Sequence, residues 1–419
     1  MATRVRSYSK INLGLAIGPV RPDGYHALAT LYQTLALHDR VTVEARRLES
    51  EDASASQGAT VGCGAAARAS RISLTTNHAQ VPTDARNTAW KMVERALARM
   101  DVAAEVAVHI EKNLPVQGGM GAGSANAAAA LIGLERELGI ALPAAERLEL
   151  AAEVGSDVPL FLVGGTVLGS GHGECVAAMP DLPVIWCVVA MPEVGVSTPR
   201  AFQEWDGLCA ARTEAKCGGA TPARSTGPEP GRDDGAERAE LTGDPQLDRL
   251  EKLSHVYASV LGALPERSGA TPETEQTPDT SGIVRGLYPE KQQGGLEGES
   301  SGQGGRLNGL AGNTLLALVR TGIENDFETV VFPQHPLLRE IKHELMGVSA
   351  GASCIGDPAD SSGNALVAAL SGSGSALFGL YRCEADARAA QQRVQAAGCK
   401  ALLTETLPRQ QYWRNMFAE

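Results

Sequence analysis

The sequence is poor in aromatic residues and has no concentration of positive charge. Phenylalanine, tryptophan and tyrosine make up 4% of the 419 residues. The formal charge is −12, from 37 basic and 49 acidic residues, and the basic residues do not cluster. A net anion of this size without a basic patch repels a phosphate backbone. We therefore expect a small-molecule partner and no nucleic acid.

Paired cysteines and long apolar runs are also missing. The eight cysteines are irregularly spaced with no C-x-x-C pair, which favours reduced thiols over a disulfide framework or a structural zinc site. No run approaches the roughly 18 apolar residues of a membrane span, and the N-terminal residues lack the apolar stretch of a signal peptide. We expect a soluble, cytoplasmic protein with no membrane contact, and nothing here predicts its oligomeric state.

Strand and helix patterns alternate over most of the chain. The turn signal in residues 19–26 indicates flanking strands between residues 7 and 45. Apolar spacing predicts several helices, at 88–100, between the glycine-rich segment and Gly139, and at 144–153, 315–323 and 337–347. Further strands are expected within 159–177, 184–192 and 365–381. The alternation predicts an α+β or α/β chain of two domains, 1–180 and 181–419.

Two segments interrupt this pattern. Residues 49–70 are rich in alanine, serine and glycine, and we interpret them as an expanded loop. The second, at about 207–308, is rich in Gly, Pro, Ser, Thr and Glu, a composition too polar to offset the entropy of ordering. We interpret it as a low-complexity insertion that contains one isolated amphipathic helix, at 247–264.

The strongest local signal is the glycine-rich segment GGMGAGS at residues 118–124, between a predicted strand and a predicted helix. Closely spaced glycines let backbone N–H groups converge on an anion, and the following helix N-terminus adds free donors and a positive dipole end. The segment fits neither the Walker A pattern nor G-x-G-x-x-G. A phosphate cradle and a packing turn are equally compatible with it.

Other candidates are weak when taken singly. Lys10 in a strand is usually an outward-facing charge, and Asp157 is usually a turn residue. Asp23 is a turn former, and the rings of Tyr25 and His26, which follow Gly24, are available to a ligand. The pattern GCGAAA at 62–67 follows no convincing strand and is discounted as a dinucleotide fingerprint. The pattern GSGHG at 169–173 indicates a turn, with His172 in a solvated loop.

These segments are stronger evidence in combination than singly, because of the order in which they occur. With them in that order, the chain resembles the GHMP kinases, a family of ATP-dependent small-molecule kinases. The resemblance covers most of the chain outside the two interruptions. It depends on KINL at 10–13, RPDGYH at 21–26, NLP at 113–115 with the glycine loop, GSDVP at 155–159, GHGE at 171–174, NDFE at 325–328 and LSGSGS at 370–375. KINL and DGYH together are most similar to members whose substrate carries a cytidyl diphosphate. Gln117, Ala122 and Ala125 depart from the loop pattern usual in the family.

The resemblance implies a two-domain α+β fold, with an N-terminal glycine-loop domain and a C-terminal ferredoxin-like domain. It implies ATP-dependent phosphorylation of the 2-hydroxyl of a cytidyl-diphospho-methylerythritol, in the non-mevalonate route to isoprenoid precursors. In that reaction Asp157 is the general base and Lys10 its cationic neighbour, which favours the ionised carboxylate. Another GHMP kinase, acting on homoserine, mevalonate or a sugar, and a catalytically silent nucleotide-binding regulator remain alternatives. A structural or interaction role of the acidic insertion is a third possibility, compatible with the kinase reaction.

The same resemblance implies two sets of binding residues. The set expected at ATP is Asn87, Lys112, Pro115, Gly118, Gly119, Gly121, Gly123 and Ser124. The set expected at the cytidyl substrate is Asn12, Tyr25, His26, Thr198, Pro199 and Phe202. No acidic cluster suggests protein ligands for Mg²⁺, so we expect the metal to bind through the ATP phosphates and water.

Overall fold

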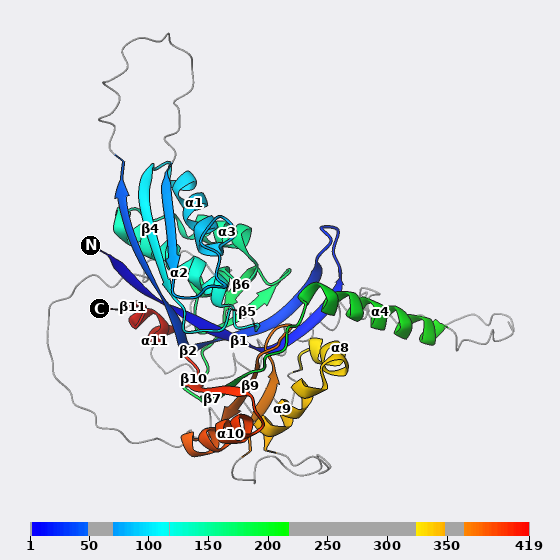
Figure 1. The fold of residues 1–419 in the computed structure, drawn as a ribbon. Helices are drawn as coiled ribbons and strands as arrows, with labels where there is room; N and C mark the ends of the chain where they lie inside the picture. Colours follow the sequence, from blue (N-terminus) through cyan, green and yellow to red (C-terminus); the bar gives the residue numbers. More distant parts are fainter. Residues whose placement is uncertain (1, 49–69, 117, 218–323, 348–363, 419) are drawn as a thin grey trace, which may run out of the picture.

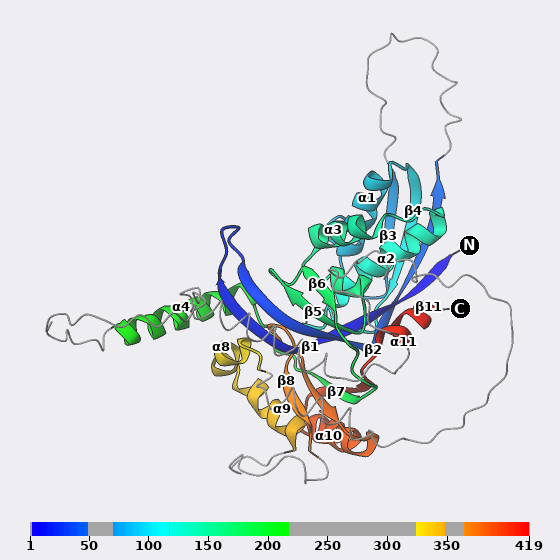
Figure 2. The same cartoon turned by 180° about the vertical axis from the view of Figure 1, so that it is seen from behind.

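The computed structural model describes residues 2–48, 70–116, 118–217, 324–347 and 364–418, with no side chains for 212–217. Within these residues the chain forms a seven-stranded and a four-stranded sheet, with helices on both (Figures 1 and 2). The α+β prediction is therefore confirmed. The predicted helices at 247–264 and 315–323, and nearly all of the expanded loop at 49–70, lie outside the described residues.

A long antiparallel hairpin forms the central part of the larger sheet. Its strands are β1 (Thr3–Val20) and β2 (His26–Arg47), joined by the predicted polar turn. The hairpin curves between the helices α1–α3 and the smaller sheet (Figure 1). Its register shifts between Tyr8 and Lys10 and again between Asn12 and Gly14. Such irregularities bend a strand and re-aim its side chains, and here they bracket Lys10 and Asn12.

The remaining strands of this sheet add to both sides of the hairpin. They are β3 (Arg71–Thr76), β4 (Ala104–Glu111), β5 (Thr166–Ser170), β6 (Cys175–Ala178) and β11 (Phe417–Ala418). The order β11-β1-β2-β4-β3 places the last strand of the chain beside the first, and β5 pairs with β2 and β6 (Figure 1). The prediction of a strand over the first residues of 159–177 is wrong, because Pro159–Leu162 forms a 3₁₀ turn.

Three helices cover one face of the larger sheet. They are α1 (Thr88–Met100), α2 (Ala122–Leu138) and α3 (Ala144–Val154), close to their predicted bounds. In β4 the burial alternates strictly, so that one face contacts the helices and the other contacts solvent. Helix α2 is buried almost throughout, and its small alanine side chains allow it to lie close to β1 and β2.

The smaller sheet consists of β7 (Trp186–Met191), β8 (Val367–Leu370), β9 (Leu377–Tyr381) and β10 (Lys400–Glu405). Its antiparallel order β10-β7-β9-β8, with helices between β7 and β8 and between β9 and β10, is that of a ferredoxin-like unit. Alternate residues of β7 contact the hairpin and the helices: Val189 packs with Ile11, and Val188 packs with the helical layer. Burial on both faces explains the continuous apolar sequence of this strand.

Helices α8 (Phe327–Gln334), α9 (Pro336–Met346) and α10 (Glu384–Ala396) belong to this unit. Helix α4 (Thr198–Cys217) extends away from it (Figures 1 and 2). Since α4 continues past residue 207, the first residues that we assigned to the insertion are helical; the rest lie outside the described residues. The domain boundary near residue 180 remains our proposal.

Within the described parts of the chain, no helix is long and apolar enough to cross a membrane.

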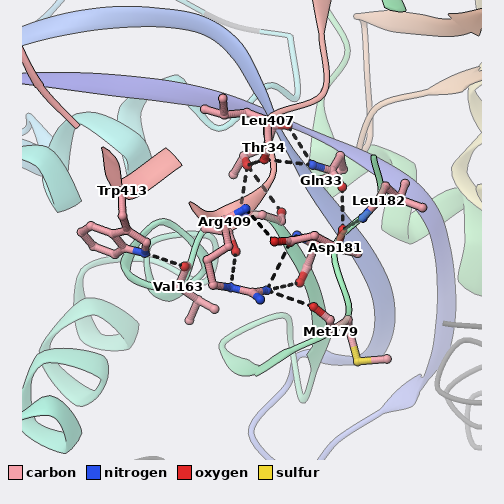
Figure 3. A network of polar contacts seen from close by, with 12 residues as sticks. Gln33, Thr34, Val163, Met179, Asp181, Leu182, Leu407, Arg409 and Trp413 are labelled. Carbon is pink, nitrogen blue, oxygen red and sulfur yellow. Dashed lines mark hydrogen bonds and ion pairs between the residues drawn. The ribbon is translucent and has the colours of Figure 1, made fainter. Parts of the chain in front are cut away.

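A polar network ties together the two places where the chain passes between the sheets (Figure 3). Arg409, after β10, donates to the carbonyls of Gly164, Thr166 and Met179 and forms an ion pair with Asp181, before β7. Asp181 accepts in turn from the backbone N–H of Arg409 at 2.7 Å. The guanidinium therefore holds both connections against β5.

The side chains of β2 extend this network (Figure 3). The Thr34 hydroxyl donates to the Leu407 carbonyl at 2.8 Å, and the Gln33 amide accepts from the Thr166 hydroxyl at 2.7 Å. Buried donors and acceptors are thus paired across three segments that are distant in the sequence.

We predict that Arg409→Gln lowers the free energy of unfolding by about 2 kcal/mol, because several partly buried acceptors lose their donor. The matched control is Arg388→Gln, which removes an exposed i,i+4 ion pair with Glu384 on α10 and is expected to cost at most about 0.5 kcal/mol. Urea unfolding of both variants measures the difference. Equal losses would show that the network adds nothing beyond an ordinary surface ion pair.

Candidate active site

A cleft of about 890 Å³ lies between the hairpin, the glycine loop, the start of α4 and the loop that joins β8 to β9. This volume is within the range of small-molecule sites. Its lining includes Lys10, Asn12, Tyr32, Asp157 and His172 at one part of the wall. Of these, Lys10, Asn12 and Asp157 are among the residues singled out from the sequence, and they come from elements far apart in the chain.

The centre of this wall is an ion pair between Lys10 and Asp157. The Lys10 ammonium lies 3.2 Å from Asp157 Oδ2, and the exposed fractions of the two side chains are 3% and 32%. The ammonium also donates to Asn12 Oδ1 at 2.6 Å. A buried charge is tolerated only when it is paired and hydrogen-bonded, and both conditions hold here. The interpretation of Lys10 as an outward-facing strand residue is thereby excluded.

Asn12 is itself held in position. Its amide nitrogen donates to the Thr30 hydroxyl at 2.8 Å, and that hydroxyl donates to the Gly14 carbonyl at 2.8 Å. The amide oxygen of Asn12 is therefore directed at Lys10. This chain of hydrogen bonds fixes the ammonium at the cleft, where a ligand oxygen could reach it.

Aromatic and imidazole rings line another part of the cleft. His26 stacks on Phe202 of α4, with ring centres 4.8 Å apart and planes 6° apart. Its Nδ1 contacts the Gly18 carbonyl at 2.9 Å, and its Nε2 lies 3.3 Å from Asp206. Tyr25 is 61% exposed, so its ring is accessible to a ligand. A flat, polar heterocycle suits such a surface.

Thr198 connects the start of α4 to the β8–β9 loop. Its hydroxyl is 2.7 Å from that of Ser373, and both residues line the cleft. Pro199, in contrast, is exposed and does not line it. The β8–β9 loop is shaped by Asn325, whose amide donates to the carbonyls of Leu370 and Gly372.

His172 is not the solvated loop histidine that we expected. It lines the cleft with 26% of its side chain exposed, and its ring centre lies 5.1 Å from that of Tyr25. Its Nδ1 is 2.8 Å from the Ser156 hydroxyl and 3.3 Å from Glu174. His172 lies in the predicted turn, between β5 and β6, and local sequence could not show its contacts because Ser156 and Tyr25 belong to other segments of the chain.

The glycine loop packs tightly against both sheets. A Cβ at Gly119 would overlap the Ser371 carbonyl oxygen, and Ala376 donates its backbone N–H to the Gly118 carbonyl. Gly118 and Gly119 line the cleft. Gly121 has φ +68° and precedes α2, and no side chain caps that helix. The first N–H groups of α2, including those of Gly123 and Ser124, are therefore available to an anion.

Six of the eight residues expected at ATP lie outside the cleft lining: Gly121, Gly123 and Ser124 at the start of α2, and Asn87, Lys112 and Pro115. Asn87 caps α1, accepting from Ala89 N–H at 2.9 Å and donating to the Pro82 carbonyl at 2.7 Å. Lys112 forms a buried ion pair with Asp39. Pro115 lies in the segment before the glycine loop. Asp39 also accepts from the backbone N–H groups of Asn113 and Leu114 at 2.8 Å, so this pair fixes the start of the loop.

Residues 87–165 match the family described as GHMP kinases N terminal domain, a range that contains α1, the glycine loop, α2, α3 and Asp157. A protein of Nocardia farcinica named 4-diphosphocytidyl-2-C-methyl-D-erythritol kinase is 41% identical over 204 residues, 49% of this chain and 60% of that protein. The match to the GHMP kinases N terminal domain therefore covers the glycine loop and Asp157 of this chain. A protein of the same name from Caldicellulosiruptor saccharolyticus is 36% identical over 202 residues, 48% of this chain and 62% of that protein. The matched region spans about three fifths of the length of these curated relatives.

Solved structures of the GHMP kinase family match nearly the full chain. A crystal structure of 4-(cytidine 5'-diphospho)-2C-methyl-D-erythritol kinase has a TM-score of 0.54 at 21% identity, covering 96% of this chain and 98% of that chain. Homoserine kinase from Cytophaga hutchinsonii has the same TM-score at 15% identity, covering 98% and 96%. At these identities the likeness shows the shared fold alone.

The buried ion pair between Lys112 and Asp39 leads to a prediction about stability. We expect Lys112→Met to lower the free energy of unfolding by about 3–5 kcal/mol, because Asp39, whose side chain is 0% exposed, loses its counter-ion. The control is Arg46→Met, which removes an exposed pair with Glu105 and is expected to cost at most about 1 kcal/mol. Urea unfolding provides the measurement, and a Lys112→Met protein as stable as its parent would contradict the structural importance of this pair.

Proposed function

We propose that this chain is an ATP-dependent kinase that phosphorylates the 2-hydroxyl of 4-diphosphocytidyl-2-C-methyl-D-erythritol, in the non-mevalonate route to isoprenoid precursors. The observation that carries the proposal is the buried Lys10–Asp157 pair in a cleft that also presents the rings of Tyr25, His26 and Phe202. The charged pair can accept a proton from an alcohol, and the rings can pack against a nucleobase. The names of the curated relatives support the same substrate.

The chemistry follows from the charges around Asp157. Its carboxylate accepts the proton of the acceptor hydroxyl, and the neighbouring ammonium of Lys10 favours the ionised form needed for this role. The same ammonium stabilises negative charge as it develops on the alcohol oxygen. Both groups are preorganised, because Asn12 already orients Lys10.

The N-terminus of α2 fits the phosphates of ATP, because its free N–H groups follow Gly121 without a side-chain cap. ATP supplies the phosphoryl group that is transferred. We assign Gly118, Gly119, Gly121, Gly123 and Ser124 to the phosphates. Pro115 is proposed to contact ATP. Asn87 and Lys112 are proposed near the adenine, where they act through the segments that they fix, since their side-chain groups are already paired.

Mg²⁺ is proposed to accompany the ATP phosphates. Among the described residues, no group of three or more His, Cys, Asp or Glu side chains is arranged to hold a metal ion. The protein therefore contributes mainly N–H donors and the Lys10 charge to the site. The proposed Mg²⁺ ion would neutralise the negative charge of the phosphates.

The cytidyl substrate is proposed to occupy the remaining cleft. Tyr25, His26 and Phe202 are assigned to the base, and Asn12, Thr198 and Pro199 to the rest of the molecule. Thr198 and Asn12 line the cleft, and Pro199 begins the helix that carries Phe202.

The deciding experiment is transfer of phosphate from ATP to purified 4-diphosphocytidyl-2-C-methyl-D-erythritol, with the product identified by mass spectrometry. Homoserine and mevalonate serve as alternative acceptors. We predict that Asp157→Asn and Lys10→Met each lower the rate about 10²–10⁴-fold, since a positioned base contributes about that much. Asp386→Asn on α10, outside the cleft, is expected to match the parent. Parental turnover in Asp157→Asn would remove the base assignment.

A second prediction concerns the phosphate loop. Gly121→Val should weaken ATP binding, because its Cβ would lie 2.9 Å from Phe161 Cζ and 3.1 Å from Lys10 Cγ and would displace the loop. Gly139→Val is the matched control: it has a similar φ of +63° at the other end of α2 but no atom within 4 Å of the new Cβ. Isothermal titration with ATP compares the two folded variants. If both bind ATP alike, backbone strain alone explains any loss, and Gly121 has no specific role.

A further inference from the structure

The glycines of the GSGHG segment enclose a tyrosine. A Cβ at Gly169 would lie 2.5 Å from Tyr32 Cε2, and one at Gly173 would lie 2.7 Å from the Tyr32 hydroxyl oxygen. Tyr32 is 2% exposed, so its ring is held in a slot between β2 and the β5–β6 turn. The two glycines are therefore explained by the close approach of this ring rather than by the turn itself.

The Tyr32 hydroxyl forms a hydrogen bond with Asp157, the proposed base. It donates to Asp157 Oδ1 at 3.0 Å, while Oδ2 faces Lys10 at 3.2 Å. The Lys10 ammonium also lies 5.4 Å from the centre of the Tyr32 ring. Asp157 belongs to a turn, and the terminal torsion of an aspartate is intrinsically broad. Its two oxygens are thus fixed by partners on two neighbouring strands.

We propose that Tyr32 is a positioning residue that orients the Asp157 carboxylate for removal of the proton from the acceptor hydroxyl. This inference rests on the proposed function. In the reaction the alcohol O–H bond breaks and its proton passes to Asp157, the alcohol oxygen bonds to the γ-phosphorus, and ADP leaves with the electrons of the broken P–O bond. The Tyr32 proton stays on its oxygen throughout.

Tyr32 is suited to this role because it remains a donor. Burial raises its pKa well above the ordinary value, and the nearby charges of Asp157 and Glu174 add to the effect. The hydroxyl is therefore protonated over the range in which the carboxylate is ionised. A hydrogen bond to a charged acceptor is about twice as strong as one between neutral groups, and it favours the ionised form.

The test is Tyr32→Phe, which removes the hydroxyl and keeps the ring. We expect kcat to fall about tenfold, equivalent to about 1.4 kcal/mol of transition-state stabilisation, with both KM values within about twofold of the parent. Tyr381→Phe is the matched control. It removes an equally buried tyrosyl hydrogen bond, from β9 to the Leu345 carbonyl of α9 at 2.8 Å, and should leave kcat unchanged.

A second variant guards against a failure of Tyr32→Phe to fold. Gly169→Ala displaces the Tyr32 ring from its slot and is expected to lower kcat in the same way. Parental kcat in either folded variant, or a change in KM alone, would overturn the positioning role while leaving the proposed function in place. A parent protein that phosphorylates none of the three acceptors overturns both.

Discussion

The buried ammonium of Lys10 is the constraint on which the site depends. A charge with 3% exposure is stable only where partners are already in place, and here they come from separate parts of the chain. Asp157 supplies the counter-charge and Asn12 an acceptor, while the Lys10 backbone N–H donates to the Met120 carbonyl in the glycine loop. Gly121 leaves room for the lysine stem. The proposed phosphate site and the proposed base are therefore joined through one residue, which contacts the loop with its backbone and the base with its side chain.

The fold brings these partners together by running one hairpin through both layers. One end of the hairpin packs under α1–α3, and its middle packs on the smaller sheet, where Ile11 and Leu13 meet Val189 and Phe378. Because both connections between the sheets are held by Arg409 and Asp181, the smaller sheet cannot shift without breaking that network (Figure 3). The β8–β9 loop, which belongs to the smaller sheet, is thereby kept against the glycine loop of the larger one.

Local sequence predicted the helices of the larger sheet well, because apolar periodicity decides which face of an element is buried, whereas the ferredoxin-like unit was expected from the family resemblance alone. Helix α1 was placed at its observed bounds for this reason. The environment of Lys10 could not be derived locally, since its burial depends on Asp157, which only the family resemblance related to it. Tyr32 gave no signal of its own, as a tyrosine in an apolar strand is an ordinary core residue. The spaced glycines at 169–173 were the available clue, but the ring that they accommodate lies in another strand.

The hydrogen bonds of His26 define what the far part of the cleft can recognise. A carbonyl oxygen can only accept, so the contact with Gly18 requires the proton on Nδ1. In the neutral ring Nε2 is then an acceptor, and its contact with Asp206, another acceptor, is favourable only when the ring is protonated. The Asp206 side chain is 51% exposed on α4 and is free to give way to a ligand. A neutral His26 therefore suits a ligand that offers an N–H donor in the plane of the imidazole. Phe202 covers one face of that ring, so that face is closed to a ligand.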